Sequence, residues 1–109
     1  MNSRYDLSHN LENIVFNKLI YKGYYILVYI NQGKEIDFLT EKQGKKYFIQ
    51  VALSAAEDKA YNREMRAFSG MNQLDKKPLI TTDNIDYSSS NITHVALKKF
   101  LMSKSLEEL

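Results

Sequence analysis

Residues 34–54 decide the fold, and they read K-E-I-D-F-L-T-E-K-Q-G-K-K-Y-F-I-Q-V-A-L-S. We predict two short β-strands here, residues 36–39 and 47–53, because both segments are rich in β-branched and aromatic side chains. Residues 41–45 form the turn between them, and Gly44 supplies the positive φ that tight hairpins require. The stretch therefore predicts an antiparallel hairpin.

Polar side chains interrupt both strands of this hairpin. Because successive side chains of a strand point to opposite faces, Asp37 points away from Ile36 and Phe38. The same alternation places Gln50 and Ala52 on one face of the second strand. We expect Asp37 and Gln50 to lie near the centre of the fold.

The segments before the hairpin predict a helix and a further strand. Residues 8–21 predict a helix with Ser8 as its N-cap and Gly23 as its end. Residues 24–30, Y-Y-I-L-V-Y-I, are all β-formers, which indicates a strand covered on both faces. Together with the hairpin, this strand completes an antiparallel meander.

The first helix has a broad apolar arc that contains a carboxylate. The arc comprises Leu11, Ile14, Val15, Phe16, Leu19 and Ile20. Glu12 projects inside this arc, where a carboxylate costs stability unless it reaches a partner, a metal or water. One interpretation is that Glu12 faces a site. The other is that it lies near the start of the helix, where a negative charge suits the helix dipole.

The second half of the chain predicts helix, strand, strand and helix. Ser54 and Glu57 form a capping-box pattern for a helix that runs to residue 69. Residues 79–82 and 93–97 predict strands, and residues 98–106 predict the last helix. The predicted fold is α/β, a mixed sheet with helices, in the order α-β-β-β-α-β-(β)-α.

Composition bounds the class of protein. A chain of 109 residues, with 44% apolar and 26% charged residues, suits one globular domain over residues 1–109. The absence of Cys excludes disulfides and thiolate sites and fits a cytoplasmic location. No apolar run reaches the roughly 18 residues of a membrane span, so we expect no membrane association. The histidines, His9 and His94, lack the spacing of zinc ligands. The net charge of +2 neither favours nor excludes nucleic-acid binding.

Several segments together resemble a known family. They are residues 11–24 (L-E-N-I-V-F-N-K-L-I-Y-K-G-Y), 34–42 (K-E-I-D-F-L-T-E-K) and 47–52 (Y-F-I-Q-V-A), followed in order by residues 63–68, 77–83 and 94–101. This pattern resembles the C-terminal, DUF4143-type domain of prokaryotic AAA-type ATPases. That domain belongs to the PD-(D/E)XK superfamily, so the resemblance implies a restriction-endonuclease-like core.

The resemblance also implies a partner. Relatives carry an N-terminal ATPase domain with a P-loop, whereas this chain has no G-x-x-x-x-G-K-[ST] motif. We therefore expect a C-terminal piece of a larger ATPase, with the N-terminal ATPase domain as its partner and no ATP hydrolysis by this chain.

The superfamily's reaction is Mg²⁺-assisted phosphodiester hydrolysis, in which carboxylates hold the cation and a lysine positions water or stabilises charge. The resemblance implies that the helix acid is Glu12, that the strand acid is Asp37, and that both are Mg²⁺ ligands. The (D/E)-x-K signature falls on Gln50 to Ala52, where Gln50 is neutral and Ala52 has no amine. Losing one such group commonly costs about 2.7–4 kcal/mol of transition-state stabilisation. Losing two leaves negligible turnover.

The leading hypothesis is a nuclease-fold accessory domain that binds nucleic acid or protein without catalysis. Lys59, Arg63 and Arg66 are the candidate phosphate-binding residues on the second helix, and the alternative is that they form only a solvated face.

Two other hypotheses stay open. One is an active Mg²⁺- or Mn²⁺-dependent nuclease that uses Glu12, Asp37 and Gln50, with Lys59 or Arg63 taking the place of the missing lysine. The other is a protein-interaction or dimerisation domain that uses the tyrosine-rich strand. Core packing is the competing explanation for that strand.

Overall fold

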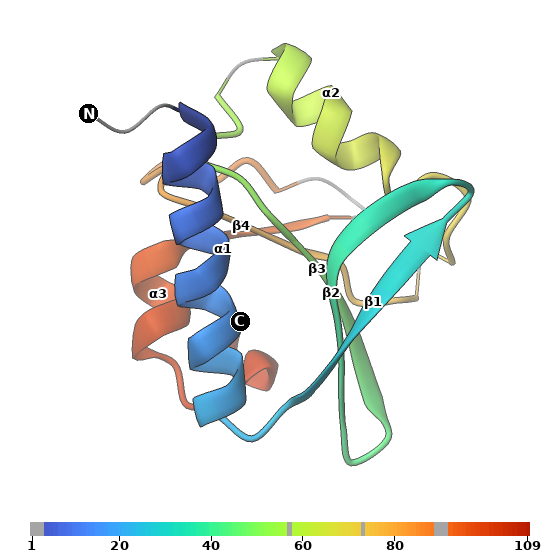
Figure 1. Cartoon of the computed structure of the whole chain (residues 1–109), viewed down its shortest axis with the longest axis vertical. Helices are drawn as coiled ribbons and strands as arrows, with labels where there is room; N and C mark the ends of the chain where they lie inside the picture. The colour runs from blue at the N-terminus through green and yellow to red at the C-terminus, as the bar shows by residue number, and fades with distance from the viewer. Residues whose placement is uncertain (1–3, 57, 73, 89–91) are drawn as a thin grey trace.

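The computed structural model describes residues 4–56, 58–72, 74–88 and 92–109 (Figure 1). The elements follow the predicted order and add a short 3₁₀ turn at the end. They are α1 (Arg4–Tyr21), β1 (Tyr25–Asn31), β2 (Lys34–Lys42), β3 (Lys45–Val51), α2 (Asp58–Arg66), β4 (Pro78–Thr81), β5 (Thr93–Ala96), α3 (Leu97–Met102) and η1 (Leu106–Glu108). Among the described residues, no helix has the length and apolar character that crossing a membrane requires.

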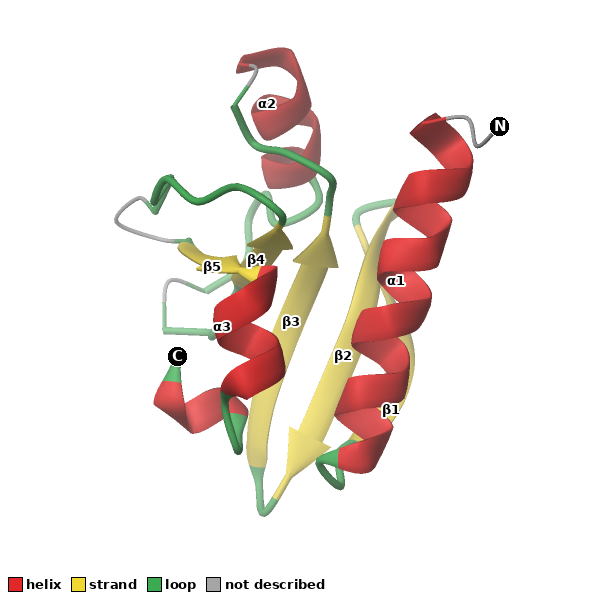
Figure 2. Ribbon diagram, turned by 90° about the vertical axis from the view of Figure 1, so that its left-hand side faces the viewer, coloured by secondary structure: helices red, strands yellow, loops and turns green. Residues whose placement is uncertain are grey.

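The strands form one five-stranded mixed sheet in the order β1-β2-β3-β4-β5. The pairs β1–β2 and β2–β3 are antiparallel, which confirms the meander, whereas β3–β4 and β4–β5 are parallel. Parallel neighbours require a crossover connection, and α2 lies within the one that joins β3 to β4. Figure 2 shows α1 and α3 in front of the sheet and α2 behind its upper end.

Both turns of the meander are two-residue turns of the type that suits twisted hairpins. Gln32 and Gly33 have φ values of 51° and 79°, and Gln43 and Gly44 have values of 54° and 79°. Positive φ at both central residues defines the type I′ turn, whose twist matches that of the flanking strands. The glycines make this conformation accessible at low cost.

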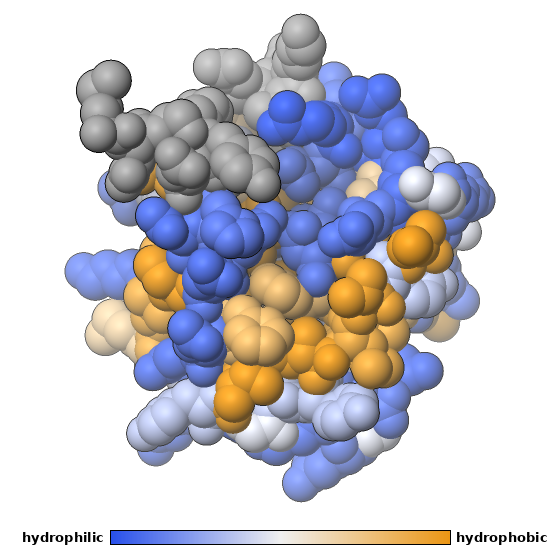
Figure 3. Space-filling view, in the orientation of Figure 1, coloured by the Kyte–Doolittle hydropathy of each residue, from blue (hydrophilic) through white to orange (hydrophobic). Residues whose placement is uncertain are grey.

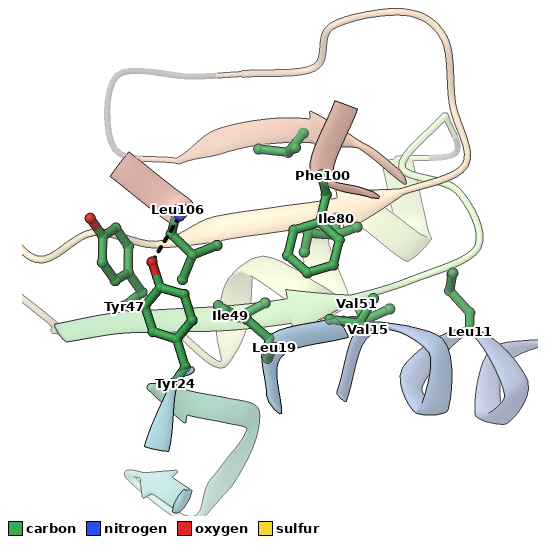
Figure 4. Close-up of a cluster of buried hydrophobic side chains, with 11 residues drawn as sticks. Leu11, Val15, Leu19, Tyr24, Tyr47, Ile49, Val51, Ile80, Phe100 and Leu106 are labelled. Atoms are coloured by element: carbon green, nitrogen blue, oxygen red, sulfur yellow. Dashed lines mark hydrogen bonds between the residues drawn. The ribbon is translucent and has the colours of Figure 1, made fainter. Parts of the chain in front are cut away.

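The sheet separates two apolar clusters. The first joins α1, α3 and η1 to the sheet through Leu11, Val15, Leu19, Tyr24, Tyr47, Ile49, Val51, Ile80, Val95, Phe100 and Leu106 (Figure 4). The second joins the segment after α2 to the other face through Ile36, Leu39, Phe48, Ala52, Ala55, Ala67, Phe68, Leu79 and Ile92. Alternate residues of β3 contribute to the two clusters, as strand alternation requires.

All three helices differ from their predicted bounds, and β2 and β3 also begin two residues earlier than predicted. α1 begins at Arg4, so Ser8 lies inside the helix rather than at its N-cap. α2 begins at Asp58 rather than directly after Ser54, and Glu57 of the predicted capping box lies outside the described residues. α3 ends at Met102, where the backbone N–H of Ser103 bonds back to Lys99 and Phe100 carbonyls.

Two burial predictions were also wrong. Within the predicted arc of α1 only Leu11, Val15 and Leu19 are buried, because only this narrow stripe faces the sheet. β1 was expected to be covered on both faces, but it is the outer strand of the sheet, and Tyr25 and Val28 are 70% and 71% exposed.

Candidate functional site

The candidate site lies where β2 and β3 diverge. The β1–β2 register changes between Leu27 and Tyr29, so that Val28 faces two β2 residues, Asp37 and Phe38. This irregularity is a β-bulge in β2, and bulges re-aim the side chains at which they occur. The β2–β3 ladder ends beside this bulge, where Phe38 pairs with Ile49.

Beyond this point the side chains of Asp37 and Gln50 take over the hydrogen bonds of the ladder. The backbone N–H of Asp37 donates to Oε1 of Gln50 at 2.7 Å. The backbone N–H of Val51 donates to Oδ2 of Asp37 at 2.8 Å. The two side chains therefore satisfy backbone donors that would otherwise lose their partners as the strands separate.

Gln50 also ties this point to α2. Its Nε2 donates to Oε2 of Glu64 at 3.3 Å, and Gln50 itself is only 4% exposed. A glutamine has one carbonyl oxygen and one NH₂ group, and both are engaged here with protein atoms. Gln50 thus bridges β2, β3 and α2.

Carboxylates crowd around this bridge and perturb one another. Burial raises the pKa of Asp37 to about 7, the Val51 N–H opposes this rise, and the charges of Glu12, Glu64 and Glu35 add to it. Burial also raises the pKa of Glu64, with Arg63 acting against the rise and Glu12 adding to it. These groups favour holding protons in the folded state, because burial and like charges disfavour the ionised forms.

Glu12 of α1 belongs to this set of interacting carboxylates. Burial raises its pKa, His9 opposes the rise, and Glu35 adds to it. The Nδ1 atom of His9 lies 4.0 Å from Oε2 of Glu12. Because α1 begins at Arg4, Glu12 lies in the middle of the helix and not near its start. That Glu12 serves a site stays a prediction.

Ala52, the residue that the resemblance aligns with the signature lysine, packs in the core. Ala52 is 8% exposed and belongs to the second apolar cluster, on the same side of β3 as Gln50 and its partner Glu64. The predicted shared face of Gln50 and Ala52 is therefore present. A cation near this pocket comes from Arg63, whose Nε lies 3.9 Å from Oε1 of Glu64 while its side chain is 68% exposed.

In the described part of the chain, no group of three Asp, Glu, His or Cys residues is arranged to hold a metal ion. The carboxylates suit a hard cation chemically. However, Oε1 of Gln50 and Oδ2 of Asp37 already accept hydrogen bonds from the backbone.

The predicted nucleic-acid-binding residues are only partly described. Arg63 and Arg66 are exposed and occupy the last turn of α2. The side chain of Lys59 lies outside the described residues.

Glu64 was missed from the sequence. The signal was available, because in the predicted helix to residue 69 Glu64 precedes Phe68 by four residues and shares its face, and Phe68 is 6% exposed in the structure. A carboxylate on an inward face is costly without a partner, which marks it as a site candidate. The bulge at Asp37 left no comparable signal.

A second polar network, away from this pocket, was also missed. Asp83 accepts from the Ser54 hydroxyl at 2.7 Å, from the Ala55 N–H at 2.7 Å and from the Thr81 hydroxyl at 2.9 Å. Burial alone would raise the pKa of Asp83, but these hydrogen bonds outweigh it and hold the pKa below its usual range. Ser54 is thus a structural donor here.

His94 completes that network. Its Nε2 lies 2.6 Å from Oγ1 of Thr81, and its Nδ1 accepts from the Tyr87 N–H at 3.1 Å. This assigns the ring proton to Nε2. The network connects the segment after β3 to the end of β4 and to β5, and each donor in it has an acceptor.

Comparison with known proteins identifies the family. The profile of the family described as "Domain of unknown function (DUF4143)" matches residues 8–100, so the chain belongs to this family. No curated protein matches the chain significantly, and no solved structure does either.

Proposed function

We propose that this chain is a nuclease-like accessory domain that binds nucleic acid or protein without hydrolysing it. It serves an ATPase domain in the same polypeptide. The resemblance to the PD-(D/E)XK superfamily and to ATPase C-terminal domains motivates the proposal. The observation that supports it most is the hydrogen bonding of the Gln50 side chain.

Gln50 supports this proposal because its side chain is engaged as a structural bridge. Its oxygen accepts from Asp37 and its nitrogen donates to Glu64. A ligand that displaces either contact breaks a hydrogen bond that links two strands or one that links strand and helix, and only one further lone pair and one further N–H of the amide remain for other partners. A catalytic carboxylate, in contrast, must offer its oxygens to the reacting groups.

Ala52 supports the same conclusion. A lysine amine stabilises the charge that develops during phosphodiester cleavage, and a methyl group cannot. Because Ala52 packs in the second apolar cluster, a lysine at this position would have to leave the core or be buried. The chain therefore lacks both the acid and the amine of the signature.

A second candidate function is a Mg²⁺- or Mn²⁺-dependent nuclease that uses Glu12, Asp37 and Gln50. It is favoured by the interaction of the charges of Glu12, Asp37 and Glu64, which a divalent cation would relieve. The present hydrogen bonds of Gln50 and Asp37 count against it.

A cleavage assay distinguishes the two functions. Purified protein is incubated with single- and double-stranded DNA and RNA in the presence of Mg²⁺ or Mn²⁺, with Asp37→Ala as the matched variant. We expect no cleavage by either protein. Cleavage by the wild type that is lost in Asp37→Ala would refute the proposal and establish the nuclease.

A binding assay tests the nucleic-acid branch. Fluorescence anisotropy of labelled DNA and RNA is measured at low and high salt for the wild type and for Arg63→Ala/Arg66→Ala. The control is Lys98→Ala/Lys99→Ala on α3, which removes the same charge from another exposed helix. If the arginines contact phosphates, only their removal lowers the affinity and the salt dependence. Absence of binding at low salt would leave a protein as the ligand.

A further inference from the structure

Exposed apolar side chains of α1 and β1 form one surface. Val28 and Ile30 of β1 are 71% and 62% exposed, and Phe16 and Ile20 of α1 are 39% and 52% exposed. We call these four residues the α1–β1 surface. Figure 3 shows apolar side chains gathered on the side of the molecule where Figure 1 draws α1 and β1 toward the viewer.

The members of the α1–β1 surface lie on the same side of the sheet. Ile26 packs against the first apolar cluster, which contains the α1 residues, and alternation gives the two β1 members the same face as Ile26. Phe16 reaches β2, where its ring centroid lies 5.9 Å from that of Phe38. Ile20 follows Phe16 by four residues on the same flank of α1.

The outer edge of β1 lacks the features that usually prevent an edge strand from pairing with another chain. β1 is paired with β2 only, among the strands of the described residues. Residues 23–33 contain no charged residue and no proline, although edge strands are normally blunted by lysine, proline or a bulge. The bulge here adds its extra residue to β2, which leaves the outer edge of β1 regular.

We propose that a second copy of this chain covers the α1–β1 surface, with the two β1 strands pairing in antiparallel fashion across a two-fold axis. A two-fold axis brings a patch against itself, so an uncharged apolar patch meets an uncharged apolar patch. The pairing also supplies partners for the outward N–H and C=O groups of both strands. A net charge of only +2 leaves little repulsion between the copies.

The size of the surface suits a dimer. With Tyr25 and Leu27 on the other face of β1, the exposed side chains present an area on the order of 700 Å², close to the about 800 Å² that each partner contributes to a standard interface. Pairing at the β1 edge brings both faces of the strand against the partner, so the α1–β1 surface and the side chains of Tyr25 and Leu27 together make up the interface.

Sedimentation velocity tests the proposal on the full chain over a range from low to high micromolar concentration. We expect a monomer–dimer equilibrium that Ile30→Lys shifts toward monomer. The dimer dissociation constant rises by about 100-fold, because the substitution brings like charges to the two-fold interface. The matched control is Ile85→Lys, since Ile85 is 66% exposed and belongs to the β4–β5 connection.

Three results would overturn the proposal. They are a monomer at every concentration, a dimer that Ile30→Lys leaves intact, and a dimer that Ile85→Lys disrupts equally. If Ile30→Lys unfolds, as judged by circular dichroism, Val28→Lys replaces it. Hydrogen–deuterium exchange provides an independent readout, because the outward amides of β1 should gain protection with concentration only if β1 lies in the interface.

Discussion

Replacing Asp37 by Asn should change the pH dependence of stability in a defined direction. The substitution keeps an oxygen that can accept from the Val51 N–H and removes the charge. In the wild type, burial raises the pKa of Asp37 from 3.8 to about 7. Between these pH values the folded chain holds a proton that the unfolded chain has released, so wild-type stability falls as the pH rises through this window.

The magnitude follows from the width of the window. Each pH unit within it costs about 1.4 kcal/mol of the free energy of unfolding. From about pH 5 to about pH 8 the wild type should therefore lose about 2–3 kcal/mol relative to Asp37→Asn, with no further loss above this range. The pKa values of Glu12 and Glu64 are raised as well, but both residues remain in the variant, so the difference between the two proteins isolates Asp37.

Urea unfolding followed by circular dichroism measures this difference, with both proteins compared at each pH. Asp86→Asn is the control of opposite sign. Hydrogen bonds from Ser88 lower the pKa of Asp86, so it contributes stability above the pKa of its unfolded form that is lost in acid. Parallel stability curves for the wild type and Asp37→Asn would refute the assignment of a buried, charge-crowded carboxyl.

Two further substitutions test contacts described above. Gln50→Glu removes the donor to Glu64 and adds a carboxylate beside it. We expect the free energy of unfolding to fall by about 2–4 kcal/mol at neutral pH and by less at acidic pH, where the carboxylates are protonated. Urea unfolding at neutral and at acidic pH measures both values. An equal loss at both values would contradict the repulsion. Tyr24→Phe removes the hydroxyl that accepts from the Leu106 N–H at 2.8 Å (Figure 4). We expect the free energy of unfolding to fall by about 1–3 kcal/mol and amide exchange at Leu106 to become faster. Unchanged exchange would show that this bond does not hold η1.

The order of elements could be predicted from the sequence because local patterns specify it. Gly33 and Gly44 mark the two turns of the meander, and strand alternation divides β3 correctly between the two faces of the sheet. Gly23, at φ 89°, ends the first helix where predicted. Each of these features depends on a few neighbouring residues.

The exposure of β1 and the composition of the pocket could not be predicted in this way. The local sequence of an apolar strand is the same whether another strand or solvent lies beside it. The exposure of Tyr25 and Val28 could therefore not be derived from the sequence pattern. Glu64 reaches Gln50 only because the crossover returns α2 above the end of β3. Such contacts depend on tertiary placement rather than on local spacing.

The identity of residue 50 determines how the pocket is held together. Where β2 and β3 separate, the N–H groups of Asp37 and Val51 need acceptors, and the side chains of Asp37 and Gln50 provide them. A glutamate at this position would place three carboxylates together, with Asp37 and Glu64, and such a group requires protons or a cation. Glutamine instead donates to Glu64 and removes one charge. A neutral amide at position 50 is therefore what lets the pocket be held together by protein hydrogen bonds.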